Sequence, residues 1–327
     1  KLTVMKNISK VIKLSLLTIA AVITFSCSDD DNTSTPVPNN SITDIASGNA
    51  NLSILVDALT RTDLDQTLDQ SGSYTVFAPT NDAFTTFLAA NGFSSLDEVP
   101  DAALKEILLN HVLSGSFNSS SLTTGYVKTL AKGSASSTNT LSMFVNTSSG
   151  VKLNGVSTVT TANISASNGI IHIVDNVIGL PTVVTHALAN PNFSTLVTAL
   201  TRDDQPDFAG ILSGTESSPF TVFAPTNAAF GSLLTELGAT SLNDIDQSTL
   251  ENTLKYHVVA GANVLASTLM NNQSVTTFQG QSFTITTTGG AKITDANGRM
   301  SNIILTDVQA SNGVIHAIDK VVLPNLN

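Results

Sequence analysis

Five histidines in this 327-residue sequence could transfer protons near neutral pH or bind a metal. They are His111, His172, His186, His257 and His316. Four of them form two pairs along the chain, because His257 follows His111 by 146 residues and His316 follows His172 by 144. The sequence contains no G-x-S-x-G nucleophile elbow, no phosphate-binding P-loop and no H-E-x-x-H zinc motif. We therefore expect no catalytic residue, no metal site, no cofactor and no enzymatic activity.

The paired histidines belong to segments that occur twice. Residues 75–84 recur as residues 221–230 with nine identities in ten positions. Residues 166–177 recur as residues 310–321 with eight identities in twelve. A period near 140 residues is too long for a solenoid, whose repeats run to about 50 residues. The sequence therefore predicts two tandem domains.

Each unit reads as mainly helical first and mainly β later. In the first unit, Leu52, Leu55, Val56 and Leu59 have the spacing of one helix face. A short strand over 74–78 comes next, and a helix then begins at Thr80 or Asn81. Threonine-rich alternating segments follow, with hairpin signals at Asn154-Gly155 and Asn297-Gly298, and an apolar strand over 169–177 ends the unit. The pattern predicts an α+β fold in which Asn81 and its counterpart Asn227 start helices.

Three motifs together resemble the fasciclin domain. They are the Thr-Val-Phe-Ala-Pro-Thr-Asn box, a His-Val pair in mid-unit and the Asn-Gly-x-Ile-His-x-x-Asp box. The resemblance covers residues 41–325 in two copies, which we divide into domain 1 (41–181) and domain 2 (182–327). It implies that each copy is a compact β wedge with a cluster of helices on one side. It also implies a role in cell adhesion or matrix attachment, since many family members are secreted or membrane-anchored.

The recurring histidines have a structural interpretation. His172 and His316 lie in the apolar terminal strand of each unit, where a neutral imidazole needs a hydrogen-bond partner but no substrate. His111 and His257 continue apolar helical stripes, which favours packing in the core. His186 has no counterpart in the first unit, and we expect it to be solvated.

The resemblance gives His257 a second interpretation. In animal matrix members of the family, a Tyr-His pair at this point is tied to integrin adhesion. The second unit has Tyr256-His257, whereas the first has Asn110-His111. Tyr256 and His257 are therefore candidate partner-binding residues, and core packing is the alternative.

The N-terminal segment differs sharply from the rest of the chain. Residues 1–26 carry four lysines and no acid, whereas the remainder has 10 basic and 25 acidic residues, so the net charge of −11 divides into +4 and −15. Residues 14–25 are mostly apolar but shorter than the roughly 20 residues of a spanning helix. This pattern resembles a bacterial lipoprotein signal (1–26) that ends before the only cysteine, Cys27, which would carry the lipid. The alternatives are an unmodified cysteine in a membrane helix and an ordinary secretory signal.

Residues 27–40 read as a flexible acidic and polar tether. Its Asp29-Asp30-Asp31 run resembles an export signal of some surface lipoproteins, and a solvated spacer is the alternative. The acidic charge of the rest of the chain argues against nucleic acid as a partner. A single cysteine excludes an intramolecular disulfide.

These observations lead to one predicted function and one alternative. We expect a lipid-anchored outer-membrane protein, exposed on the cell surface, that acts in cell adhesion or extracellular matrix attachment. Its partners would be the membrane, through the lipid, and a surface protein or polysaccharide. The alternative function is a surface ligand- or polysaccharide-binding lipoprotein in nutrient capture. The alternative locations are the periplasmic face of the membrane and secretion.

Overall fold

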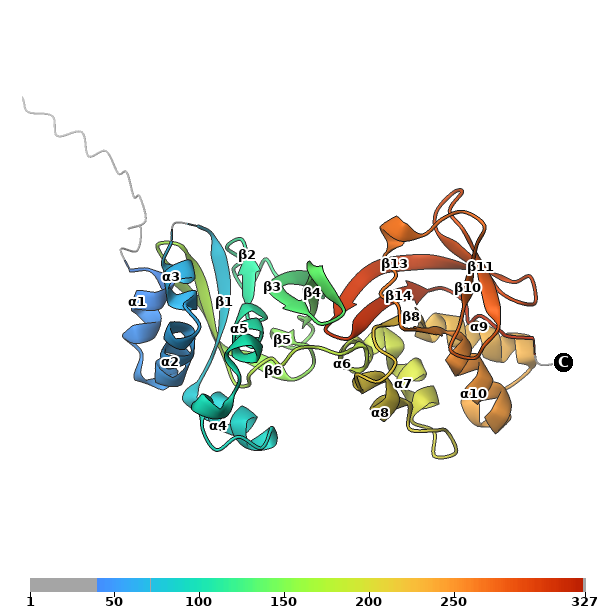
Figure 1. Cartoon of the computed structure of the whole chain (residues 1–327), viewed down its shortest axis with the longest axis horizontal. Helices are drawn as coiled ribbons and strands as arrows, with labels where there is room; N and C mark the ends of the chain where they lie inside the picture. Colours follow the sequence, from blue (N-terminus) through green and yellow to red (C-terminus); the bar gives the residue numbers. More distant parts are fainter. Residues whose placement is uncertain (1–39, 71, 326–327) are drawn as a thin grey trace, which may run out of the picture. The chain divides into compact units, whose positions relative to one another are not determined.

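The computed structural model describes residues 40–70 and 72–325. Within these ranges the chain builds the same arrangement twice, and in each repeat the first helices precede the sheet (Figure 1). No helix in the described ranges is long and apolar enough to cross a membrane. The predicted signal peptide, Cys27 and nearly all of the predicted tether lie outside the described residues.

The first repeat is a seven-stranded sheet with helices packed against it. Its helices are α1 (Ile42–Ser47), η1 (Ala50–Leu52), α2 (Ser53–Arg61), α3 (Leu64–Asp69), α4 (Asn81–Ala90), η2 (Leu96–Glu98) and α5 (Asp101–Leu109). Its strands are β1 (Tyr74–Pro79), β2 (Val112–Ser114), β3 (Gly125–Gly133), β4 (Ser136–Asn146), β5 (Lys152–Leu153), β6 (Ser157–Ala166) and β7 (Gly169–Val174). The strands lie in the order β2-β1-β7-β6-β5-β4-β3, and only β1 and β7 are parallel neighbours.

The second repeat has the same topology. Its helices are α6 (Val183–Ala189), η3 (Pro191–Phe193), α7 (Ser194–Leu200), α8 (Phe208–Ser213), α9 (Asn227–Leu237), η4 (Leu242–Asp244), α10 (Gln247–Tyr256) and η5 (Ala266–Thr268). Its strands are β8 (Phe220–Pro225), β9 (Val258–Ala260), β10 (Gln273–Thr276), β11 (Ser282–Thr286), β12 (Lys292–Thr294), β13 (Met300–Ala310) and β14 (Gly313–Ile318). The order β9-β8-β14-β13-β12-β11-β10 matches the first repeat strand for strand. The predicted fold class, two tandem α+β domains, is confirmed.

Two neighbouring inner strands of each sheet, β1 with β7 and β8 with β14, are buried on both faces. Along β1, alternate residues point to opposite sides of the sheet. Val76 and Ala78 pack with the helices in one core, whereas Phe77 joins Met143 and Leu153 in a second core on the other side. The second repeat also divides its interior into two cores. Burial on both faces explains why these strands read as continuous apolar runs in the sequence.

The two turn signals and the helix-start signal appear in the structure. The β5–β6 connection has Asn154 at φ 46° and Gly155 at φ 71°, as the two central residues of a type I′ turn require, and the N–H of Val156 donates to the carbonyl of Leu153 at 3.0 Å. In the longer β12–β13 connection only Gly298 has a positive φ, of 75°. Thr80 is the residue that caps α4, because its hydroxyl accepts a hydrogen bond from the N–H of Ala83 at 3.2 Å.

The β3–β4 hairpin of the first repeat makes hydrogen bonds to the second repeat. The N–H of Ala135 donates to the carbonyl of Ser311 at 2.9 Å, and the N–H of Gln309 donates to the hydroxyl of Ser142 at 3.0 Å. At Gly133 a Cβ atom would overlap the backbone of Ser311. The close approach of the two chain segments therefore depends on a residue without a side chain.

Candidate functional site

The histidine of each terminal strand is held by two backbone groups. His172 is completely buried on β7, where its Nε2 donates to the carbonyl of Phe117 at 2.9 Å and its Nδ1 accepts from the N–H of Asn163 at 3.2 Å. The corresponding atoms of the second repeat are His316 Nε2 to Val264 O at 2.8 Å and Asp307 N–H to His316 Nδ1 at 3.4 Å. Burial lowers the pKa of both imidazoles, and both are neutral in this arrangement.

The residues that donate to these imidazoles sit at bulges in the neighbouring strand. Asn163 and Asp307 adopt left-handed backbone conformations, with φ of 64° and 59°. The register of β6 against β7 and of β13 against β14 shifts around them. A bulge turns one N–H out of the regular ladder, which is what lets it reach the ring nitrogen. Asn and Asp are among the few non-glycine residues that tolerate this conformation.

The second pair of histidines ties the end of a helix to the segment after the terminal strand. His111 follows α5; its Nδ1 donates to the carbonyl of Ile107 at 2.7 Å and its Nε2 accepts from the N–H of Ile178 at 2.8 Å. The corresponding contacts in the second repeat are His257 Nδ1 to Thr253 O at 2.7 Å and Val322 N–H to His257 Nε2 at 3.1 Å. Burial lowers the pKa of both rings to about 4. Backbone groups thus engage both nitrogens of all four paired histidines.

Tyr256 is fully buried next to His257. Its hydroxyl donates to the carbonyl of Ser282 at 2.9 Å, and burial raises its pKa to about 12. In the first repeat Asn110 stands in its place and donates its amide to the carbonyls of Ile178 and Gly179. Tyr256 therefore binds the start of β11, whereas Asn110 binds the segment that follows β7. A role of Tyr256 and His257 in partner binding stays a prediction, and in this structure neither side chain lies at the surface.

Asn81 and Asn227 are the first residues of α4 and α9, and their side chains reach back to the preceding helices. The Oδ1 of Asn81 accepts from the N–H of Ile54, and its Nδ2 donates to the carbonyl of Ala50 and the hydroxyl of Ser53, each at 3.0 Å. Asn227 makes the same three contacts with Thr195 N–H, Pro191 O and Ser194 Oγ at 2.9, 2.9 and 3.0 Å. The amide therefore joins two helices in addition to starting one.

His186 differs from the expectation drawn from the sequence. It is completely buried, whereas we expected it to be solvated. A residue of the first repeat shields His186 from solvent. The ring of Tyr126 on β3 packs edge-on against the imidazole, with ring centroids 5.4 Å apart. Its Nε2 lies 3.4 Å from the carbonyl of Gln309, and its Nδ1 has no hydrogen-bond partner among the residues that the structure describes. Burial lowers the pKa of His186 to about 4.

Two further pairs of recurring side chains were not predicted to have a role. Asn168 and Asn312, in the box that contains the terminal histidine, each bind the first helix of their repeat. Arg61 and Arg202 each donate to two backbone carbonyls near the following 3₁₀ helix. Their presence at equivalent positions of both repeats is the feature of the sequence that could have identified them. Among the residues that the structure describes, no group of three or more His, Cys, Asp or Glu is placed to hold a metal ion.

Comparison with known proteins places this geometry in a family. The fasciclin domain family model matches residues 50–181 and 191–324. The uncharacterized protein sll1735 of Synechocystis sp. is 38% identical over 144 residues, which are 44% of this chain and 98% of that protein. Human periostin is 28% identical over 271 residues, which are 80% of this chain and 30% of periostin.

A solved structure is also similar. The FAS1 domain pair from the insect cell adhesion molecule fasciclin I aligns with 83% of this chain and 92% of its own, with 20% identity and a TM-score of 0.46. The family match itself covers most of the chain, once in each repeat, and includes the Thr-Asn box and the terminal histidine of both. The chain therefore belongs to the fasciclin domain family and carries two fasciclin domains in tandem.

Proposed function

We propose that this chain is a cell-surface protein, anchored by a lipid on Cys27, that acts in cell adhesion or extracellular matrix attachment. One observation carries the proposal. The polar residues that recur in both repeats, such as His111 and Asn81, are hydrogen-bonded inside their own repeat. The recurring residues thus maintain a scaffold and leave the surface to make contacts with partners. Two such modules in one chain gain avidity when both engage a surface.

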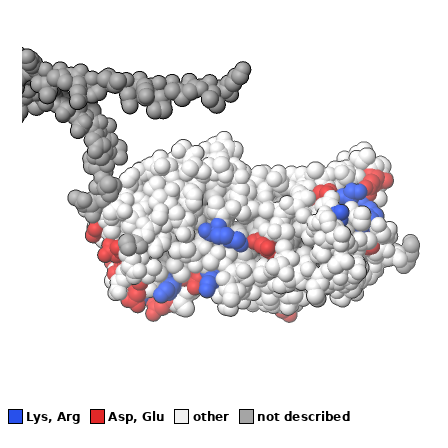
Figure 2. Space-filling model, turned by 90° about the horizontal axis from the view of Figure 1, so that it is seen from above, with Lys and Arg blue, Asp and Glu red and all other residues white. Residues whose placement is uncertain are grey.

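The surface favours partners that are recognised without charge. Charged residues make up 12% of the chain, and the face in Figure 2 is largely free of them. Hydroxyl and amide groups take their place, for example the exposed Thr160, Thr161 and Ser165 of β6. Neutral hydrogen-bonding groups of this kind suit a protein or a polysaccharide. The same observation supports the second candidate function, capture of a surface ligand or polysaccharide as a nutrient.

Attachment of whole cells tests the two functions. We expect deletion of the gene to reduce attachment to coated surfaces and to other cells, and re-expression of the full chain to restore it. Unchanged attachment on every substrate would contradict the adhesion proposal. Selective binding of the full chain to one soluble sugar on a glycan array, without an attachment defect, would instead support nutrient capture.

The anchor is tested separately. We expect labelled palmitate to enter the wild-type protein and to be absent from Cys27→Ser. Ser28→Ala is the matched control, because it leaves the cysteine in place and should label as the wild type does. Equal labelling of the wild type and Cys27→Ser would contradict lipidation. Protease treatment of intact cells then separates exposure at the cell surface from the periplasmic face.

A further inference from the structure

Each repeat has a pocket between its first three helices, and the same side chain fixes both pockets. Asn168 accepts a hydrogen bond from the N–H of Ile42 at 3.0 Å and donates to the carbonyl of Leu68, so it ties α1 to α3. The corresponding contacts in the second repeat are Val183 N–H to Asn312 Oδ1 at 3.0 Å and Asn312 Nδ2 to Leu212 O at 2.8 Å. The two pockets therefore occupy equivalent places and can be compared residue by residue.

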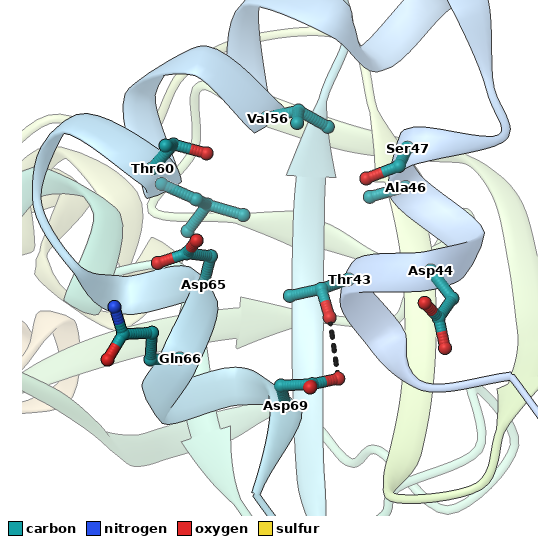
Figure 3. Close-up of a pocket in the computed structure, with 10 residues that line it drawn as sticks. Thr43, Asp44, Ala46, Ser47, Val56, Thr60, Asp65, Gln66 and Asp69 are labelled. Carbon is teal, nitrogen blue, oxygen red and sulfur yellow. Dashed lines mark hydrogen bonds between the residues drawn. The ribbon is translucent and has the colours of Figure 1, made fainter.

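The pocket of the first repeat has both polar and apolar residues in its lining. Its volume is about 210 Å³, and Figure 3 shows three carboxylates among its lining residues, those of Asp44, Asp65 and Asp69. The hydroxyl of Thr43 donates to Asp69 at 3.0 Å across one side (Figure 3). A carboxylate holds water strongly, so this lining favours a hydrated pocket.

The pocket of the second repeat has lost these groups. Val184 stands at the position of Thr43, Leu188 at that of Ser47, and Ala209 at that of Asp65. Its lining is almost entirely apolar, and no charged residue within 40–70 or 72–325 contributes to it. The fold does not require this composition, because the first repeat builds the same three-helix arrangement around aspartates.

The second pocket is also deeper in the fold. Its inner wall includes Val222 and Ala224 of β8, Ile315 of β14 and Phe208 of α8, all of which are buried. Leu188 lies at its edge with 64% of its surface exposed, where the first repeat has a serine. An exposed leucine beside an apolar cavity gives an apolar ligand a continuous surface from the solvent inward.

The volume limits what can enter. The pocket measures about 180 Å³. A dry apolar cavity of about 150 Å³ in another protein accepts benzene, so this one has room for about seven carbon atoms. Its inner wall offers no polar group to a ligand, whereas its exposed edge at Leu188 and Thr201 opens to water. An occupant therefore has an apolar end inside and any polar group outside.

We propose that this pocket binds the end of a saturated acyl chain and leaves the head group in solvent. Valine, leucine, isoleucine and alanine provide nearly all of the lining, with Phe208 the one aromatic among the residues that line it. Flexible aliphatic chains fill such a cavity without requiring a hydrogen bond. The proposal does not depend on adhesion, because it concerns a cavity of one repeat and not the outer surface of both.

Heptan-1-ol tests the proposal, because its seven carbons match the volume and its hydroxyl can stay in water. We expect its titration into the full chain, carrying methyl labels on Ala, Ile, Leu and Val, to give saturable NMR shifts. The shifting methyl groups should be those of the second pocket, such as Val184, Ala187 and Leu196. The methyl groups of Val56 and Leu59 in the first pocket should not move.

Paired substitutions separate the pocket from general hydrophobic binding. The double variant Val184→Thr with Ala209→Asp copies the first repeat, and we expect it to weaken heptan-1-ol binding at least about tenfold because a carboxylate must be dehydrated. The matched control, Thr43→Val with Asp65→Ala, changes only the first pocket and should leave the affinity unchanged. Ala187→Leu fills the cavity with a methyl-rich side chain, so it should abolish binding while raising the melting temperature.

Three outcomes would overturn the proposal. One is a shift that grows linearly with heptan-1-ol without saturating, and another is equal affinity in the wild type and the Val184→Thr, Ala209→Asp variant when both are folded. The third is tighter saturation by benzene than by heptan-1-ol, which would assign the pocket to a ring and not to an acyl chain.

Discussion

The backbone N–H of Val322 donates a hydrogen bond to Nε2 of His257, which lies 3.1 Å away and 65 residues earlier in the chain. The same ring donates from Nδ1 to the carbonyl of Thr253 at 2.7 Å. One imidazole thus joins the last turn of α10 to the segment that follows β14. The pair His111 and Ile178 makes the same connection in the first repeat.

Removal of this ring should destabilise the second repeat. We expect His257→Ala to lower the free energy of unfolding by about 2 to 4 kcal/mol, since it leaves two buried backbone groups unpaired and a cavity behind. Tyr256→Phe, which removes only the hydroxyl bonded to Ser282, should cost about 1 kcal/mol. Urea unfolding measures both. A His257→Ala protein with wild-type stability but weaker cell attachment would instead favour the partner-binding role.

Acid should weaken the fold in a defined pH window. Burial lowers the pKa of His111, His186 and His257 to about 4, whereas the ordinary value is 6.5. The unfolded chain therefore binds protons first, so stability is complete above pH 6.5 and decreases as the pH falls toward 4. Each pH unit in this window costs about 1.4 kcal/mol for each histidine. Urea midpoints at pH 7.5 and pH 5 should differ accordingly, and equal midpoints would contradict the burial of these rings.

His186 offers a separate test of the same window. Its Nδ1 is buried without a partner, and its ring contacts Tyr126 edge-on. We expect His186→Phe to keep the aromatic contact while it removes both the unpaired nitrogen and the 3.4 Å contact from Nε2 to the carbonyl of Gln309, so stability at pH 7.5 should change by less than about 1 kcal/mol. The loss of stability between pH 7.5 and 5 should become smaller by the contribution of one histidine. An unchanged pH dependence would show that His186 does not contribute to it.

The asparagines at the start of α4 and α9 should matter more than the acid beside one of them. Asn81→Ala and Asn227→Ala each remove three hydrogen bonds between helices, and we expect a loss of about 1 to 3 kcal/mol for each. Asp82 is exposed, and the second repeat has Ala228 at its position. Asp82→Ala should therefore cost less than about 1 kcal/mol, through the helix dipole alone. Thermal unfolding compares the three variants.

Gly133 should control the contact between the repeats. A Cβ at this position overlaps Ser311, so Gly133→Ala should separate the hairpin from the second repeat and speed hydrogen exchange at the Ala135 amide. Gly231→Ala is the control, because a Cβ there meets no atom within 4 Å and the residue lies inside a helix. It should be neutral or stabilising by up to about 1 kcal/mol. Unchanged exchange at Ala135 in the Gly133 variant would contradict the contact.

The fold could be predicted from the sequence because the same pattern of residue types occurs in both repeats. Strand alternation placed His172 on a face with aliphatic neighbours, but its partner Asn163 depends on a bulge that no pattern of residue types marks. His186 was assigned to solvent because its cover, Tyr126, belongs to the other repeat. Contacts between distant segments need coordinates, whereas periodicity describes only neighbours along one element.

The two pockets are a second example of a feature that sequence patterns do not predict. The lining of the first pocket comes from three helices over residues 43–69, and that of the second comes from three helices and two strands over residues 183–315. The structure shows that Thr43 and Val184 are equivalent, because Asn168 and Asn312 bind the helices of these two residues in the same way. The residues that make the two linings different can be read from the sequence, but only the fold shows that they line equivalent pockets.

The parallel pairing of β1 with β7 has a consequence for how the protein is made. An inner strand of the sheet is supplied last, because β7 lies between β1 and β6 and leaves the ribosome after both. Until Val174 has emerged, β1 has no neighbour on that side, and the second repeat waits for β14 in the same way. The sheet of each repeat can therefore be completed only after its last strand has been synthesised.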